Sequence, residues 1–166
     1  MKVLKFGGSS VGSIENINRI ISIVRGEIEL GNEVVLVCSA FSKVTDQLIN
    51  AGKLAEKKDN LTYLEIFESF KERHRAAIEA LVTKKEIYDV MMDEFTDSMV
   101  RVEDILKGIN LLGELSDKTL AQLVSFGERF SSFIVAGALR NADLNGIYVN
   151  ATKLVRTDSN YLSAKV

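Results

Sequence analysis

The sequence lacks several features that would mark a membrane, disulfide-rich or nucleic-acid-binding protein. It has a single cysteine, Cys38, which excludes a disulfide bond within the chain. No apolar run reaches the ~20 residues that a bilayer-spanning helix needs. With 21 basic and 23 acidic residues, the formal net charge is -2. This balance gives no attraction to nucleic acid or to an anionic membrane, so a small anionic substrate would need local basic groups.

The chain is long and apolar enough to fold. Its 166 residues suit one domain, and 46% of them are hydrophobic. The N-terminus enters a strand pattern directly, without the basic-then-apolar layout of a signal peptide, so we expect a cytoplasmic protein. No linker or repeat divides the sequence, and the single domain is expected to run over residues 1–166.

The first forty residues predict a β-loop-α-β unit. An apolar strand over residues 1–6 breaks into a loop at residues 7–10. Ser13 is the expected N-cap of an amphipathic helix that ends at Gly31. Residues 33–39 then form a continuous apolar run, which is typical of a parallel strand covered on both faces.

Residues 44–141 contain no proline and no strand-like alternation, which predicts a series of helices. Thr62 with Glu65 has the form of a capping box, and Ser116 is expected to begin a later helix. Residues 146–149 predict a third strand. Three strands are few for so much helix, so we expect that either a missing C-terminal portion or a partner chain completes the sheet, and we favour the first.

Three segments carry candidate chemistry. Lys5, Gly7 and Gly8 stand where a strand passes into a helix, and such a glycine pair lets the backbone approach an anion. The spacing matches neither a dinucleotide-binding fingerprint nor a P-loop, and an ordinary glycine-rich turn is the alternative. A hydroxyl cluster, residues 39–45, follows the second strand, where ligands bind in α/β sheets, although a helix cap is equally expected. In residues 125–131, Glu128 could hold an amino group or form an intrahelical ion pair.

Together these segments resemble the aspartate kinases of the amino acid kinase family. The resemblance rests on Lys-Phe-Gly-Gly-Ser-Ser-Val at the start, the hydroxyl cluster ending at Thr45, the Gly127-Glu128 pair and the closing residues 156–161, in that order. It implies an α/β fold, an αβα sandwich of the amino acid kinase type that is truncated and carries a helical insertion. It also implies that residues 1–166 are the N-terminal part of a catalytic domain, without the nucleotide-binding half and the regulatory ACT domains.

The implied activity is ATP-dependent phosphorylation of the β-carboxylate of L-aspartate, the first step toward lysine, threonine and methionine. The resemblance implies these roles: catalysis by Lys5, phosphate binding by Lys5, Gly7, Gly8 and Ser9, and aspartate binding by Ser39, Thr45 and Glu128. Mg²⁺ would be held by the nucleotide, with no metal site on the protein. The expected partners are L-aspartate, ATP and a second copy of the chain, and the chain alone is expected to be inactive.

The sequence departs from the family at two places. Asn150 stands where relatives often have aspartate, and the later Gly-Arg-Gly-Gly-Ser-Asp element is absent. Two alternatives stay open: another member of the family acting on glutamate, acetylglutamate or a nucleotide, and a non-catalytic binding module. The long helical middle favours aspartate over the first.

Other reactive side chains are expected to be structural. His74 stands among charged residues and predicts a solvated helix face. Cys38 is expected to be a small buried hydrophobe. Phe67, Phe70 and Phe95 are expected to pack between helices.

Overall fold

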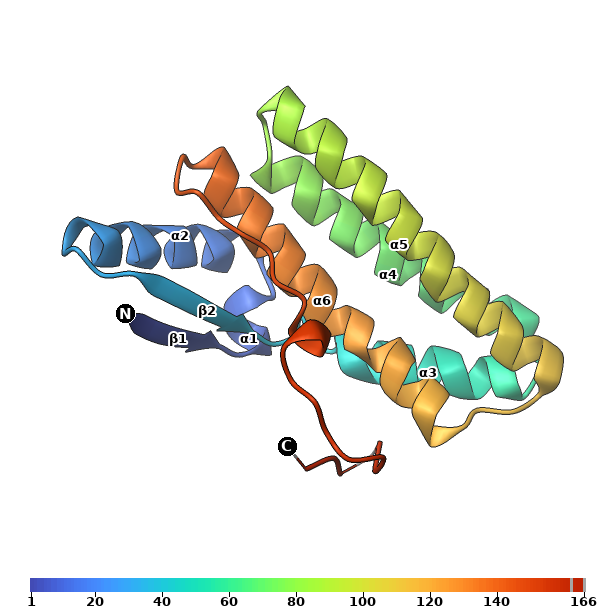
Figure 1. Cartoon of the computed structure of the whole chain (residues 1–166). Helices are drawn as coiled ribbons and strands as arrows, with labels where there is room; N and C mark the ends of the chain where they lie inside the picture. The colour runs from blue at the N-terminus through green and yellow to red at the C-terminus, as the bar shows by residue number, and fades with distance from the viewer. Residues whose placement is uncertain (162, 166) are drawn as a thin grey trace.

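The computed structural model describes residues 1–161 and 163–165. A small sheet with one covering helix lies at one end of the molecule, and a bundle of long helices forms the rest (Figure 1). The elements in chain order are β1 (Lys2–Phe6), α1 (Gly8–Val11), α2 (Ile14–Glu29), β2 (Val34–Cys38), α3 (Val44–Glu56), α4 (Asn60–Leu81), α5 (Lys85–Leu112), α6 (Asp117–Asn141) and the short 3-10 helix η1 (Ala151–Lys153).

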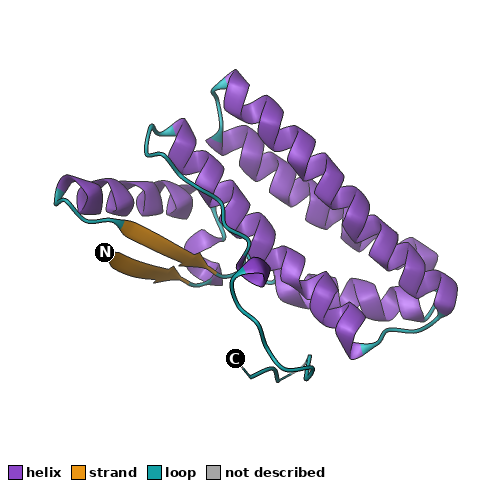
Figure 2. Cartoon of the chain, in the orientation of Figure 1, coloured by secondary structure: helices purple, strands orange, loops and turns teal. Residues whose placement is uncertain are grey.

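The two strands pair in parallel, with Lys2 opposite Val34 and Phe6 opposite Cys38, so the predicted β-α-β opening is confirmed (Figure 2). The inward side chains of β2 pack against α2 and α6. Val35 and Val37 point the other way and remain 45% and 48% exposed. The prediction that this strand is covered on both faces is therefore wrong for the described residues, because helices cover only one face of the sheet here.

Local signals set most helix starts. Ser13 and Ser116 cap α2 and α6 as predicted, and each accepts a hydrogen bond from the backbone three residues later. The capping box at Thr62 is wrong, because the Asp59 side chain accepts from the Thr62 N–H at 3.2 Å and α4 begins at Asn60. The predicted loop at residues 7–10 is also wrong in part, since Gly8 begins a single helical turn, α1.

The predicted third strand at residues 146–149 does not form in the described part of the chain. This segment runs back along α6 (Figure 1), and its polar groups bond there: Arg140 Nε donates to the Gly146 carbonyl at 2.6 Å. Tyr148 meets the ring of Phe133 edge-on at 5.7 Å. The described sheet keeps two strands, and this segment is held by a side-chain hydrogen bond and a ring contact from α6 rather than by a neighbouring strand.

The helical middle is confirmed as four long helices, and its core is aromatic. Phe70, Phe95 and Phe126 are buried around Phe130, with ring centroids 5.6 to 6.0 Å from it. Centroids at this separation suit tilted and edge-to-face packing. Phe67 is buried as well, so the prediction that the phenylalanines pack between helices is confirmed.

The prediction of a solvated His74 is wrong. The side chain is fully buried and stacks flat on Phe41, with ring centroids 4.9 Å apart. Its Nδ1 donates to the Phe70 carbonyl at 2.7 Å, while Nε2 is buried without a partner in the described structure. Burial lowers the pKa of His74 from 6.5 to about 4, and the neighbouring charge of Arg73 adds to this. The imidazole is therefore neutral at physiological pH.

We expect this buried histidine to make folding stability sensitive to mild acid. Well above pH 6.5 neither the folded nor the unfolded state protonates it; as pH falls through 6.5 toward 4, the unfolded state binds the proton and the folded state mostly does not. At about 1.4 kcal/mol per pH unit, the free energy of unfolding should fall by about 3 kcal/mol across this window. Urea unfolding at a series of pH values measures the fall. His74→Phe should remove most of it, and an unchanged slope in that variant would contradict the assignment.

Candidate functional site

The carboxyl ends of β1 and β2 meet at one edge of the sheet. The Ser39 N–H donates to the Phe6 carbonyl at 3.0 Å and extends the parallel ladder by one bond. The turn after β1 lies directly against the loop after β2, since a Cβ on Gly8 would come within 2.9 Å of the Ala40 carbonyl oxygen. Only glycine fits at this contact without movement of the backbone.

Helix α6 reaches the same edge. The Ala40 N–H donates to Glu128 Oε1 at 3.4 Å, which places this carboxylate beside the loop after β2. The buried Ser131 hydroxyl donates to the Ser39 carbonyl at 2.7 Å, and the Glu128 carbonyl lies 3.0 Å from the same oxygen. The sequence does not predict this role of Ser131, because a serine inside an apolar helix gives no sign of the distant carbonyl that it bonds.

Contacts bring some of the predicted site residues together at this edge, and others are exposed near it. The turn at Gly8, the backbone of Ser39 and the carboxylate of Glu128 are brought together by the contacts above. Lys5 is exposed near the end of β1 and forms no ion pair among the described residues. Thr45 is exposed in the first turn of α3, next to Val44, which packs against Gly127.

The two remaining predicted residues lie in the turn after β1. Gly7 is the N-cap of α1, and Ser10 N–H donates to its carbonyl at 2.9 Å. Ser9 is exposed, and its carbonyl accepts from Asn16 Nδ2 at 2.8 Å. The bond from Asn16 ties the turn to α2 and leaves the Ser9 hydroxyl at the surface.

Arg73 of α4 joins the two loops next to the site, a role that the sequence does not predict. Its guanidinium donates to the carbonyls of Ser42, at 2.8 Å, and Gly12, at 3.3 Å, and it lies 5.6 Å from the centre of the Phe41 ring. One cation thus holds the segments that follow β1 and β2 at a fixed separation. The charged neighbours of Arg73 in the sequence hid this role.

Cys38 ends β2 close to the site but is not a candidate nucleophile. The side chain is buried, as predicted, and burial raises the pKa of its thiol to about 11. A thiol with such a pKa carries almost no thiolate at neutral pH. It packs as a small hydrophobic side chain.

Gly127 gives a direct test of how closely α6 must approach. An added Cβ would lie 2.8 Å from the Cβ of Ala40 and 3.2 Å from Cγ1 of Val44. Gly127→Ala should therefore push α6 away and cost about 1 to 3 kcal/mol in the free energy of unfolding. Chemical denaturation measures this cost. The matched control is Gly26→Ala in α2, where nothing lies within 4 Å and alanine should stabilise slightly. Equal effects in both variants would contradict the packing argument.

Neither a metal site nor a membrane span is found in the part of the chain that the structure describes. Among the described residues, no group of three His, Cys, Asp or Glu side chains is arranged to hold an ion. No described helix is both long and apolar enough to cross a membrane.

Known proteins with similar sequences include aspartokinases and bifunctional aspartokinase/homoserine dehydrogenases. The chain is 28% identical over 159 residues to an aspartokinase of Candida albicans, covering 92% of this chain and 28% of that protein. It is 33% identical over 139 residues to the chloroplastic aspartokinase 1 of Arabidopsis thaliana, covering 82% of this chain and 23% of that protein. The chain therefore spans less than a third of the length of these relatives.

One solved structure has a similar fold although its sequence is only 24% identical to this chain. Escherichia coli aspartokinase III, crystallised with aspartate and ADP, superposes with a TM-score of 0.82 at 24% identity, over 98% of this chain and 34% of that one. This likeness confirms the predicted fold class, truncated relative to the whole domain. The model of the amino acid kinase family matches residues 1–165. Because that match takes in nearly every residue, the chain belongs to the amino acid kinase family.

Proposed function

We propose that the chain is part of an aspartate kinase, which transfers the terminal phosphoryl group of ATP to the β-carboxylate of L-aspartate and forms 4-phospho-L-aspartate. The names of the relatives support this, and the similar Escherichia coli enzyme was crystallised with aspartate and ADP. We further propose that the reaction serves lysine, threonine and methionine synthesis in the cytoplasm.

One observation carries the proposal: three segments far apart in the sequence lie against one another at the carboxyl edge of the sheet. The turn at Gly8 touches the loop at Ala40, and Ala40 also contacts the carboxylate of Glu128. Ligands of open α/β sheets bind at this edge. A glycine-rich turn suits a phosphate group, and a carboxylate suits an ammonium group.

The proposed roles follow from the charges of the reactants. The Lys5 ammonium offsets negative charge on the transferring phosphoryl group, and Gly7, Gly8 and Ser9 contact phosphate oxygens. The β-carboxylate of aspartate is ionised at neutral pH, so it attacks without a general base. Catalysis then depends on holding donor and acceptor in line and on stabilising charge.

The aspartate site needs partners for two carboxylates and one ammonium group. Glu128 would bind the ammonium group, and the hydroxyls of Ser39 and Thr45 would donate to carboxylate oxygens. Mg²⁺ is assigned to the ATP phosphates, where it neutralises charge, and no protein ligand is assigned to it. Binding both reactants would also use parts of the longer protein, so this chain by itself is proposed to be inactive.

We also propose that the enzyme is a homodimer. The outer face of the sheet exposes Val3, Val35 and Val37, a row of apolar side chains that a folded protein usually covers. Either the rest of the longer protein or a second copy of the chain could cover this row, and because Lys5 stands on the same face, opposite Val37, the cover has to leave the Lys5 ammonium free. Light scattering measures the oligomeric state of this chain, and a monodisperse monomer would contradict dimer formation through this face.

The test of function uses the protein encoded by the whole reading frame that contains this chain. It is incubated with Mg-ATP and L-aspartate, and the acyl phosphate is trapped with hydroxylamine as the hydroxamate. The proposal predicts hydroxamate with aspartate and much less with glutamate or N-acetylglutamate. Turnover with one of the latter two would show a different member of the family, and tight ligand binding without turnover would show a binding module.

A further inference from the structure

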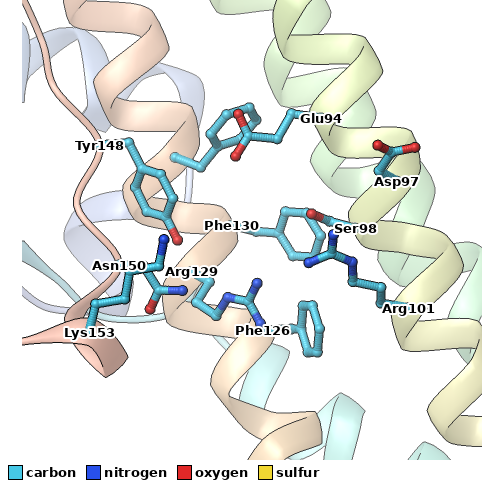
Figure 3. Close-up of a pocket in the computed structure, with 11 residues that line it drawn as sticks. Glu94, Asp97, Ser98, Arg101, Phe126, Arg129, Phe130, Tyr148, Asn150 and Lys153 are labelled. Atoms are coloured by element: carbon cyan, nitrogen blue, oxygen red, sulfur yellow. The ribbon is translucent and has the colours of Figure 1, made fainter.

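A cavity lies between α5, α6 and the segment that ends in η1 (Figure 3). It is open to solvent and has a volume of about 330 Å³. The rings of Phe126, Phe130 and Phe133 line it. None of the residues assigned above to aspartate or to phosphate lines this cavity.

Three cations line the cavity without an anionic partner. Arg101 of α5, Arg129 of α6 and Lys153 of η1 form no ion pair among residues 1–161 and 163–165. Arg129 lies over the ring of Phe126, 4.2 Å from its centre, and its Nε is buried without an acceptor. A buried guanidinium N–H without an acceptor is costly, and because Nε itself is closed to solvent, an anion in the cavity would be held by the terminal nitrogens of Arg129.

The two guanidinium groups are placed to share one anion. Figure 3 shows the Arg101 and Arg129 side chains pointing into the same space between α5 and α6. Like charges that face one another repel, and an anion between them converts the repulsion into charge-assisted hydrogen bonds. Carboxylates and phosphates match the planar fork of donors on arginine.

The end of the cavity away from Arg129 carries negative charge. Glu94 of α5 lies there, apart from Arg129, and Asp97 stands one turn before Arg101 (Figure 3). Neither carboxylate takes part in an ion pair within the described residues, and no salt bridge joins Asp97 to Arg101. A second negative charge on the ligand would be repelled at this end, whereas an amino group would be attracted.

We propose that this cavity binds a small zwitterionic molecule, with its carboxylate or phosphate between Arg101 and Arg129 and its amino group toward Glu94. The phenylalanine rings would contact the carbon chain between the two charged ends.

The proposal is tested by titrating the isotope-labelled protein and following the Arg129 Nε–H signal by proton–nitrogen correlation. The probes are propionate and ethyl phosphate, which supply the anionic group and the carbon chain, and β-alanine and phosphoethanolamine, which add only an amino group to each. We expect a saturable shift of the Arg129 signal, and the matching zwitterion should bind about threefold tighter than its anion alone. Comparison of the two pairs identifies the anionic group as carboxylate or phosphate.

Variants distinguish a site from general attraction to positive charge. Arg101→Gln should weaken binding about tenfold or more, because a charged hydrogen-bond donor is lost from the anion. Arg101 is exposed, so its replacement should leave the melting temperature nearly unchanged. The control is Lys118→Gln, an exposed cation of α6 away from the cavity. No shift with any probe, or equal weakening by both variants, would overturn the site. Equal affinity for the zwitterions and their anions would overturn the assignment of the amino group.

Discussion

Replacing Lys5 by alanine is expected to lower kcat by about 100-fold or more in the protein encoded by the whole reading frame. The reason is that a positive charge aimed at a transferring phosphoryl group acts mainly in the transition state. The KM for aspartate should change little. Lys5 is exposed and forms no ion pair among the described residues, so the free energy of unfolding should stay nearly constant.

The control for Lys5 stands on the same strand. Lys2 pairs with Glu27 at 2.7 Å, on the outside of the molecule. Lys2→Ala removes an equal charge from β1 but loses only a surface ion pair, which is typically worth less than about 1 kcal/mol. Steady-state kinetics with Lys2→Ala should match the parent. A similar fall in kcat for both variants would show that Lys5 acts through general charge or stability.

Replacing Glu128 by glutamine is expected to raise the KM for aspartate by about 30-fold or more, because the ammonium group of the substrate loses its charged partner. Glutamine keeps an oxygen that can accept from the Ala40 N–H, so the loop after β2 should keep its position. The KM for ATP should stay within a few-fold of the parent. The measurement is initial rates over a range of aspartate concentrations.

Glu65→Gln provides the matched control for Glu128. Glu65 is an exposed carboxylate of α4 that forms no salt bridge within the described part of the chain. Its replacement should leave both KM values unchanged. If Glu128→Gln lowers kcat but leaves the KM for aspartate unchanged, the carboxylate does not bind the amino group and its assigned role is wrong.

Features fixed by near neighbours in the sequence were predictable. The caps at Ser13 and Ser116 depend on bonds to residues three positions later. The apolar spacing of residues 14–28 and the unbroken helical pattern of the middle also needed no knowledge of distant contacts. These signals were enough to predict the β-α-β opening and the helical region.

Features that depend on distant contacts were not predictable. Residues 146–149 have the composition of a strand, but contacts with α6 decide their conformation. His74 stands among charged residues, yet its position on α4 turns it toward Phe41 and Phe130. Val35 and Val37 lie in an apolar run that predicts two-sided burial, and no sequence pattern shows that one side stays exposed here.

The sequence predicted residues for the candidate site, but only some of the contacts between them. The motifs at Lys5, Thr45 and Glu128 could be recognised from their order, but not the close contacts of Gly8 and Gly127 with Ala40. Arg73 and Ser131, which hold the surrounding loops, gave no sequence signal at all. Their bonding partners are backbone carbonyls, and any residue supplies one of those.

Hydrogen–deuterium exchange with and without L-aspartate tests the shared aspartate site most directly. In the protein encoded by the whole reading frame, bound aspartate should slow exchange together in three segments, around Gly8, around Ala40 and around Glu128. Glu128→Gln should abolish the effect at the same aspartate concentration. Slowed exchange elsewhere, with these three segments unchanged while the enzyme turns over aspartate, would contradict the site.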